Sequence, residues 1–198
     1  MVTSQHCANF LAMLEEAVAS AVNEGDTESR AFTRVAAEWL GYDLEEQLTD
    51  GANDRGVDFW CETDSGYELF QVKSKELSKE GKISLSAFDK GGVDDLRRMV
   101  EFLEEDPPSK HSNEKVAQLH KDWRMSISKR RMSEKPQPLE VDLKLVLFGE
   151  GLTGPAEGEY NAFRNTLADR AVDDVPVVFR PQIVTVLVQP ESDSWVRN

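Results

Sequence analysis

Two short apolar runs separated by turn residues constrain the fold of this chain more than any other part of it. The first run, residues 57–60 (VDFW), follows a glycine-rich turn that begins at Asp50. The second run, residues 67–73 (YELFQVK), follows a turn over residues 63–66. Both runs are rich in aromatic and β-branched residues, so together they predict a β-hairpin.

The alternation of side chains along a strand brings three polar residues of this hairpin together. Successive side chains point to opposite faces of a sheet, so Gln71 and Lys73 share one face with Leu69. The antiparallel partner strand can hold Asp58 opposite them. We therefore expect a carboxylate, an amide and an ammonium on one patch of the sheet.

This set of groups favours hydrolysis of a phosphodiester with a divalent metal. A hard cation such as Mg²⁺ takes oxygen ligands, usually one or two carboxylates together with waters and substrate phosphates. Asp58 can supply a carboxylate and Gln71 a neutral oxygen, while Lys73 can orient the attacking water or stabilise charge that builds on the phosphate. The sequence therefore predicts a Mg²⁺ or Mn²⁺ site at Asp58 and Gln71, with Lys73 as a catalytic residue.

The residues of the hairpin resemble a known family. The string GVDFW followed by FQVKSK is similar to the core of PD-(D/E)XK nucleases, in the Mrr-like variant where glutamine replaces an acid. The longer string TDGANDRGVDFW resembles the N-terminal nuclease domain of abortive-infection phage-resistance (AIPR) proteins. The resemblance implies one nuclease domain over residues 1–198, with a restriction-endonuclease-like α/β fold whose mixed central sheet is flanked by helices. It also implies a metal-dependent DNA endonuclease used in restriction or anti-phage defence.

In the resembling family, a helix before the hairpin contributes another acid to the metal site. A helix over about residues 27–40 is predicted here by a stripe of four apolar residues, Phe32, Val35, Ala36 and Trp39. Glu28 lies four residues before the core-facing Phe32 and fits the role best, and Glu38 is the competing candidate. The alternative is that either acid is only a first-turn or surface residue.

The remaining elements follow from periodicity and turn residues. A helix over about residues 4–22 has Leu11, Leu14, Val18 and Val22 on one side, and we expect it to pack on the domain or on a second subunit. Further helices are predicted over residues 93–105, 115–132 (capped by Ser112) and 157–171. Strands are expected over residues 42–48, 141–148, 175–179 and 182–188, the last two being separate or one strand kinked at Pro181.

Basic residues are concentrated between residues 109 and 138, although the whole chain has a net charge of −14. This segment carries eight basic side chains against three acidic ones. A basic surface on an acidic protein is compatible with nucleic-acid binding, and a solvated helix face is the competing interpretation. On the first interpretation the residues that contact DNA are Lys121, Arg124, Lys129, Arg130 and Arg131. The segment Lys110–Lys135 should then lie beside the active face.

A formal G-x-G-x-x-G pattern over residues 149–154 is the main competing motif. In dinucleotide-binding folds the third glycine lies inside a helix and an acid ends the next strand. Here Pro155 follows the pattern at once, and the candidate acids Asp173 and Asp174 precede the next strand. We therefore prefer a glycine-rich turn between a strand and a helix.

The composition is that of a globular protein on the polar side, with 39% apolar and 30% charged residues. We find neither a signal-peptide pattern nor an apolar run long enough to cross a bilayer, so we expect a cytoplasmic protein without a membrane partner. Cys7 and Cys61 are expected to be free thiols. The expected partners are DNA and, in addition, a second copy or a further domain or subunit.

Two functions of other classes stay open. A catalytically silent module with the same fold could serve binding or assembly, although the presence of Asp58, Gln71 and Lys73 argues against it. The acidic net charge suggests a regulatory protein that mimics DNA, but a mimic should be acidic throughout, and the basic segment argues against it.

Overall fold

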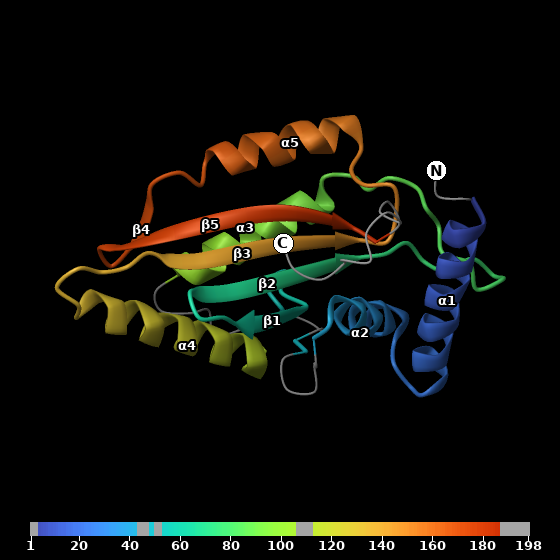
Figure 1. Ribbon diagram of the computed structural model, residues 1–198, viewed down its shortest axis with the longest axis horizontal. Helices are drawn as coiled ribbons and strands as arrows, with labels where there is room; N and C mark the ends of the chain where they lie inside the picture. The colour runs from blue at the N-terminus through green and yellow to red at the C-terminus, as the bar shows by residue number, and fades with distance from the viewer. Residues whose placement is uncertain (1–3, 43–47, 50–52, 106–112, 187–198) are drawn as a thin grey trace.

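The computed structural model describes residues 4–42, 48–49, 53–105 and 113–186. Within these ranges the chain forms five helices and one five-stranded mixed sheet (Figure 1), so the expected α/β fold with helices flanking a mixed central sheet is confirmed. The elements are α1 (Ser4–Asn23), α2 (Glu28–Leu40), β1 (Phe59–Glu62), β2 (Gly66–Lys73), α3 (Gly91–Glu104), α4 (Glu114–Arg131), β3 (Leu139–Leu147), α5 (Gly154–Asn165), β4 (Arg170–Val172) and β5 (Val175–Thr185).

The sheet has the strand order β1-β2-β3-β5-β4. The three inner strands β2, β3 and β5 are parallel, and the outer strands β1 and β4 pair antiparallel with their neighbours. Parallel strands need long crossover connections. The helices α3 and α4 provide the crossover from β2 to β3, and α5 lies on the way from β3 to β4 and β5.

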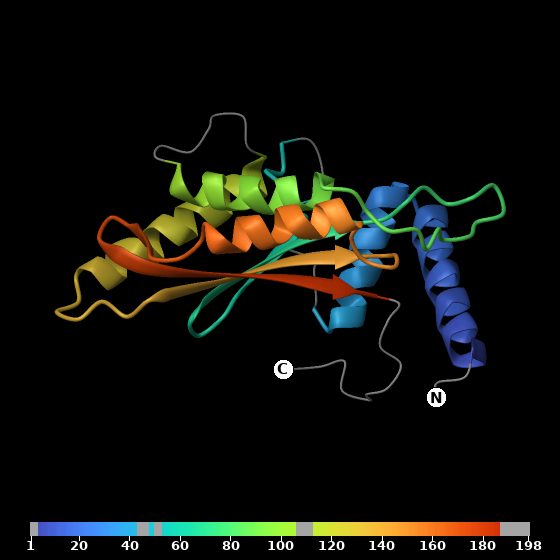
Figure 2. The same ribbon diagram turned by 90° about the horizontal axis from the view of Figure 1, so that it is seen from above.

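Helices cover the two faces of the sheet unequally, as Figure 2 shows. One face packs against α3, α4 and α5 in a core that includes Leu69, Leu143 and Trp123. The other face packs against α2 near the carboxyl ends of the strands, where Phe59 stacks on Phe70 with ring centroids 4.1 Å apart. No helix of the described chain covers the remainder of this second face.

The N-terminal helix α1 packs on the domain itself, through α2 and the connector after β2. Its buried residues Leu14, Val18 and Ala21 belong to the same core as α2. Val22, which was expected on this stripe, is 37% exposed. The steps from Leu14 to Val18 and Ala21 keep one helical face, whereas Val22 lies a further 100° around the helix.

The chain after β3 departs from the sequence-based expectation. The helix predicted to reach residue 171 ends at Asn165, and the short strand β4 follows it. β4 and β5 form a hairpin whose turn residues Asp173 and Asp174 have φ angles of 48° and 66°. Two-residue hairpin turns of this type need positive φ at both positions, which Asp tolerates. β5 continues through Pro181, at a point where β4 has ended and the strand is an edge.

Two further expectations concern the glycine-rich turn over residues 149–154 and the cap of α4. Gly149 lies against Phe88 and the carbonyl of Ser86, where a Cβ would come within 2.7 Å of both, and the third glycine of the pattern begins α5. The preferred glycine-rich turn is thus confirmed. Asn113, in place of the expected Ser112, caps α4 by accepting a hydrogen bond from Val116 N at 2.9 Å.

Two expectations remain, one about the strand over residues 42–48 and one about membrane-spanning helices. Residues 43–47 of the expected strand over 42–48 lie outside the described residues, and Leu48 forms an isolated bridge with Phe59. In the described ranges, no helix combines the length and the apolar character needed to span a bilayer.

Candidate active site

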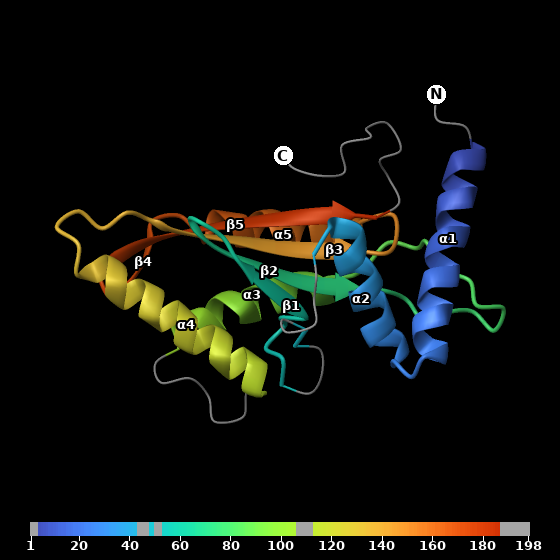
Figure 3. The same ribbon diagram turned by 60° about the horizontal axis from the view of Figure 1, so that its bottom comes forward.

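A pocket of about 590 Å³ lies at the carboxyl end of β2, near the start of α2 and the loop that leads into β1. All four residues that the sequence analysis selected for the site line it. The complete lining consists of Glu28, Ser29, Asp54, Asp58, Gln71, Val72, Lys73, Ser74, Glu76 and Leu77. Figure 3 shows the carboxyl end of β2 beside α2, two of the elements that contribute to this lining.

Asp58 and Gln71 face each other inside this pocket. Asp58 immediately precedes β1, and its backbone N–H donates to Phe70 O at 2.8 Å, which continues the β1–β2 pairing by one residue. Its carboxylate oxygen Oδ2 accepts hydrogen bonds from Gln71 Nε2 at 2.7 Å and from Val72 N at 2.6 Å. Asp58 and Gln71 are only 5% and 6% exposed. The predicted convergence of these two side chains is therefore confirmed.

Lys73 reaches the same pocket from the last residue of β2, and its ammonium has a partner that sequence analysis missed. Lys73 Nζ lies 2.6 Å from Asp95 Oδ2, and Asp95 comes from α3. The other oxygen of Asp95 lies 2.7 Å from Arg98 Nη1. A signal was present in the sequence, because Asp95 precedes the buried Met99 and Phe102 by four and seven residues and so lies on the apolar side of the helix.

The structure discriminates between the two candidate helix acids. Glu28 is the first residue of α2, lines the pocket, and accepts a hydrogen bond from Leu77 N at 2.7 Å through Oε1. Glu38 lies ten residues further along the helix, is exposed, and is absent from the pocket lining. Glu28 is thus the acid of α2 that the fold places at the site.

The loop before β1 brings one more carboxyl group to the pocket. Asn53, Arg55 and Gly56 all have positive φ, and Asp54 stabilises this turn by accepting a hydrogen bond from Gly56 N at 2.8 Å. Burial raises the pKa of the Asp54 carboxyl, and the nearby charge of Asp95 raises it further. Asp54 therefore caps the turn that leads into β1.

The donor set of the pocket fits a hard divalent cation that keeps most of its own water. Within the described ranges, no three or more His, Cys, Asp or Glu side chains are grouped so that they could hold a metal ion. Mg²⁺ commonly takes only one or two protein carboxylates and completes its shell with waters and phosphate oxygens. Asp58 and Glu28 could provide those carboxylates. Gln71 donates its Nε2 to Asp58 here, so its amide would have to turn to present Oε1 to an ion.

The basic end of α4 lies far from this pocket, contrary to expectation. Arg130 Nη2 donates to Ser65 O at 3.0 Å, which places this end of the helix at the β1–β2 turn. Lys73 is at the opposite end of β2, and a strand of this length spans roughly 23 Å. The prediction failed because a charge pattern along a helix does not reveal which end of the sheet the helix approaches.

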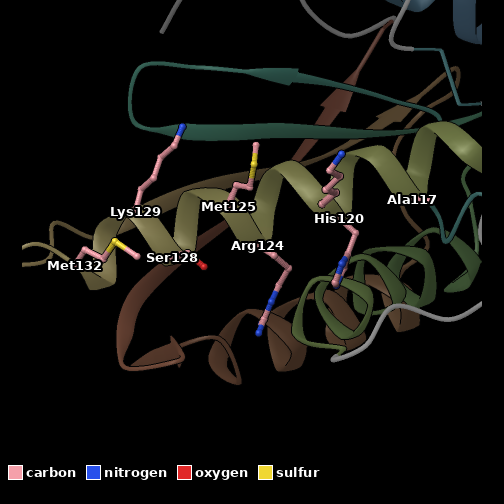
Figure 4. A pocket seen from close by; sticks show the side chains of 8 residues that line it. Ala117, His120, Arg124, Met125, Ser128, Lys129 and Met132 are labelled. Carbon is pink, nitrogen blue, oxygen red and sulfur yellow. The ribbon is translucent and has the colours of Figure 1, made fainter.

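The outer side of α4 carries a groove of about 510 Å³ that combines basic and apolar side chains (Figure 4). Lys121, Arg124 and Lys129 line it together with Met125 and Met132, which are 47% and 87% exposed. Figure 4 shows Lys129 and Arg124 extending to opposite sides of the helix. Arg124 Nη2 forms an ion pair with Asp173 at 2.8 Å. The apolar stripe of α4 is buried in the core and consists of Val116, Leu119, Trp123 and Ile127.

The lone histidine of α4 is buried in the core. His120 is 1% exposed, and its Nε2 lies 2.9 Å from Glu105 O. It packs beside Phe102, with the ring centroids 5.1 Å apart.

A scan against protein-family models, a search of curated proteins and a search of solved structures each found no match to this chain. The chemistry of the pocket and the resemblance of the hairpin residues are therefore the grounds on which a function can be inferred.

Proposed function

We propose that this chain is a divalent-metal-dependent endonuclease that hydrolyses phosphodiester bonds in DNA. The observation that carries the proposal is the convergence of Glu28, Asp58, Gln71 and Lys73 on one pocket, although these residues span 45 positions of the sequence. The resemblance of the hairpin to Mrr-like and AIPR nucleases supports a role in restriction or anti-phage defence.

The proposed roles follow from the chemistry of each side chain. A bound Mg²⁺ or Mn²⁺ would polarise the phosphate and lower the pKa of a coordinated water. Asp58 and Glu28 would hold the cation, and Gln71 would add a neutral oxygen. Lys73 would stabilise the charge that develops on the attacked phosphate, close to the buried Asp58 and Gln71, where screening by water is reduced.

One observation favours a competing function, that of a catalytically silent binding module. The Asp58 Oδ2 atom accepts two hydrogen bonds from β2, which is also what a purely structural carboxylate at a strand end would do. The two functions differ in what the loss of the Asp58 charge does. A structural role predicts a loss of stability, and a metal-binding role predicts a loss of cleavage in a protein that still folds.

Conversion of supercoiled plasmid to nicked or linear DNA tests the proposal. We expect cleavage with Mg²⁺ or Mn²⁺ and none with excess EDTA. Asp58→Asn should abolish cleavage without changing the urea unfolding midpoint appreciably, because the amide keeps the size of the side chain. Asp64→Asn, the same change at an exposed position of the β1–β2 turn, is the matched control and should cleave normally. Cleavage by Asp58→Asn at the wild-type rate would contradict the proposal.

A further inference from the structure

The catalytic lysine of the proposed nuclease is held by an acid from a different element. Lys73 Nζ and Asp95 Oδ2 are 2.6 Å apart, and the Lys73 side chain is 32% exposed while that of Asp95 is 8% exposed. A lysine side chain is flexible, and its ammonium without a partner samples many positions. We infer that Asp95 is a positioning residue that fixes the Lys73 ammonium in the pocket, an inference that rests on the proposed nuclease function.

Asp95 is itself fixed, which is what a positioning residue requires. Its second carboxylate oxygen lies 2.7 Å from Arg98 Nη1. The neighbouring residues Leu96 and Met99 are fully buried in the core between α3 and the sheet. The loop before β1 also packs on it, because the space beside Gly56 is closed by the backbone carbonyl of Asp95. Both oxygens and the backbone of Asp95 are thus constrained.

Asp95 and the proposed metal ligands come from different elements. Asp58 and Gln71 belong to the β1–β2 hairpin and Glu28 to α2, whereas Asp95 belongs to α3, which packs on the sheet face that Leu69 and Lys73 share. Asp95 is absent from the pocket lining, so it acts through Lys73 and not on the phosphate. Its loss should therefore slow the chemical step and leave the affinity for DNA almost unchanged.

Two neighbours on the same helix provide matched controls. Asp94 pairs with Arg97 at the same i, i+3 spacing and the same 2.7 Å distance as Asp95 with Arg98, but it has no contact with Lys73. Arg98→Met removes the other partner of Asp95 and leaves the Lys73 pair. If Asp95 served only to hold Arg98 or the start of α3, Arg98→Met would reproduce the effect of Asp95→Asn.

The test measures single-turnover cleavage of a labelled DNA duplex at saturating protein and Mg²⁺, and the DNA dissociation constant in Ca²⁺ or EDTA. We expect Asp95→Asn and Asp95→Ser to lower the cleavage rate at least tenfold with less than a twofold change in the dissociation constant. Asp95→Glu, which keeps the charge one methylene away, should fall between them and the wild type. Asp94→Asn and Arg98→Met should cleave within about twofold of the wild type. If Asp95→Asn does not fold, the comparison is made with Asp95→Ser.

The outcomes distinguish this inference from the proposed function. Wild-type cleavage together with normal rates for both Asp95 variants would overturn the positioning role and leave the nuclease intact. Equal losses for Arg98→Met and Asp95→Asn would also overturn it, in favour of a structural role of α3. A wild-type protein that cleaves no duplex with Mg²⁺ or Mn²⁺ would overturn the proposed function, and the role of Asp95 with it.

Discussion

Asp58 shows at the scale of one residue how the hairpin holds a buried carboxylate in one orientation. It stands one position before β1, where the pairing with β2 ends, so the Val72 N–H points at its side chain and Gln71 lies opposite. A buried carboxylate needs such hydrogen bonds. They also leave its orientation fixed, which is the condition for binding a cation with defined geometry.

Cys61 provides a residue-scale prediction on the sheet face that α2 only partly covers. Burial, together with the smaller effect of the nearby charge of Glu68, raises the pKa of the Cys61 thiol from an ordinary 9.0 to about 11. Since the thiolate is the reactive form, alkylation of Cys61 at pH 8 should be about a hundredfold slower than that of an ordinary thiol. The measurement is the iodoacetamide rate against pH in a Cys7→Ser variant.

The direction of this pH dependence is fixed by the raised pKa. The rate should keep rising up to about pH 11, and Glu68→Gln should move the inflection to lower pH because it removes a negative charge. A plateau that begins near pH 9 would show that the thiol is not desolvated in this way.

At the scale of elements, the loop before β1 and helix α3 form one unit behind the pocket. Gly56 has a φ of 81°, and a Cβ at this position would lie 2.8 Å from Asp95 O. Gly56→Ala should therefore cost more than the roughly 1–2 kcal/mol of the left-handed conformation alone. Gly81 has a φ of 73° with no atom near its missing side chain, so Gly81→Ala is the control that carries only the conformational cost. The free energies of unfolding in urea give both values, and equal losses would contradict the close packing.

The hairpin and the stripes of the helices could be predicted because they depend on neighbours in sequence. Alternation along β2 was sufficient to bring Gln71 and Lys73 to one face. The short strand β4 was not predictable in the same way, because the buried Leu167 continues the helical pattern although α5 ends at Asn165. The strand is defined by its pairing with β5, a contact that the apolar pattern does not show. Asp95 was missed for a related reason, since its contact with Lys73 joins two elements across the fold.

At the scale of the whole molecule, the pocket and the carboxyl-terminal end of α4 lie near opposite ends of β2, so a bound DNA that contacts both must extend along the β1–β2 hairpin. In α4 Arg124 pairs with Asp173 and Arg130 with Ser65 O, whereas Lys121 and Lys129 are exposed. These two lysines are accordingly the better candidates for phosphate contacts.

Reversal of Lys121 and Lys129 to Glu tests this arrangement. We expect weaker DNA binding and a slope of log affinity against log salt that is smaller by about 1.8, because each lost phosphate contact contributes about 0.9. Lys79→Glu with Arg164→Glu makes the same change in net charge at exposed positions on other elements and should leave the slope nearly unchanged. Equal slopes in both double variants would show that the basic residues of α4 form a solvated helix face and do not contact DNA.

The proposed active site is tested most directly by comparing Lys73→Ala with Lys75→Ala in single-turnover DNA cleavage at saturating Mg²⁺. Lys73 lines the pocket, while Lys75 lies beyond the end of β2 with its ammonium over the Phe88 ring at 4.8 Å. A donor that meets charge developing on the phosphate contributes roughly 3–4 kcal/mol, so Lys73→Ala should slow cleavage about a hundred- to a thousandfold. Lys75→Ala should stay close to the wild type. Equal losses for both variants, or a loss for Lys75→Ala alone, would contradict the site assigned to this pocket.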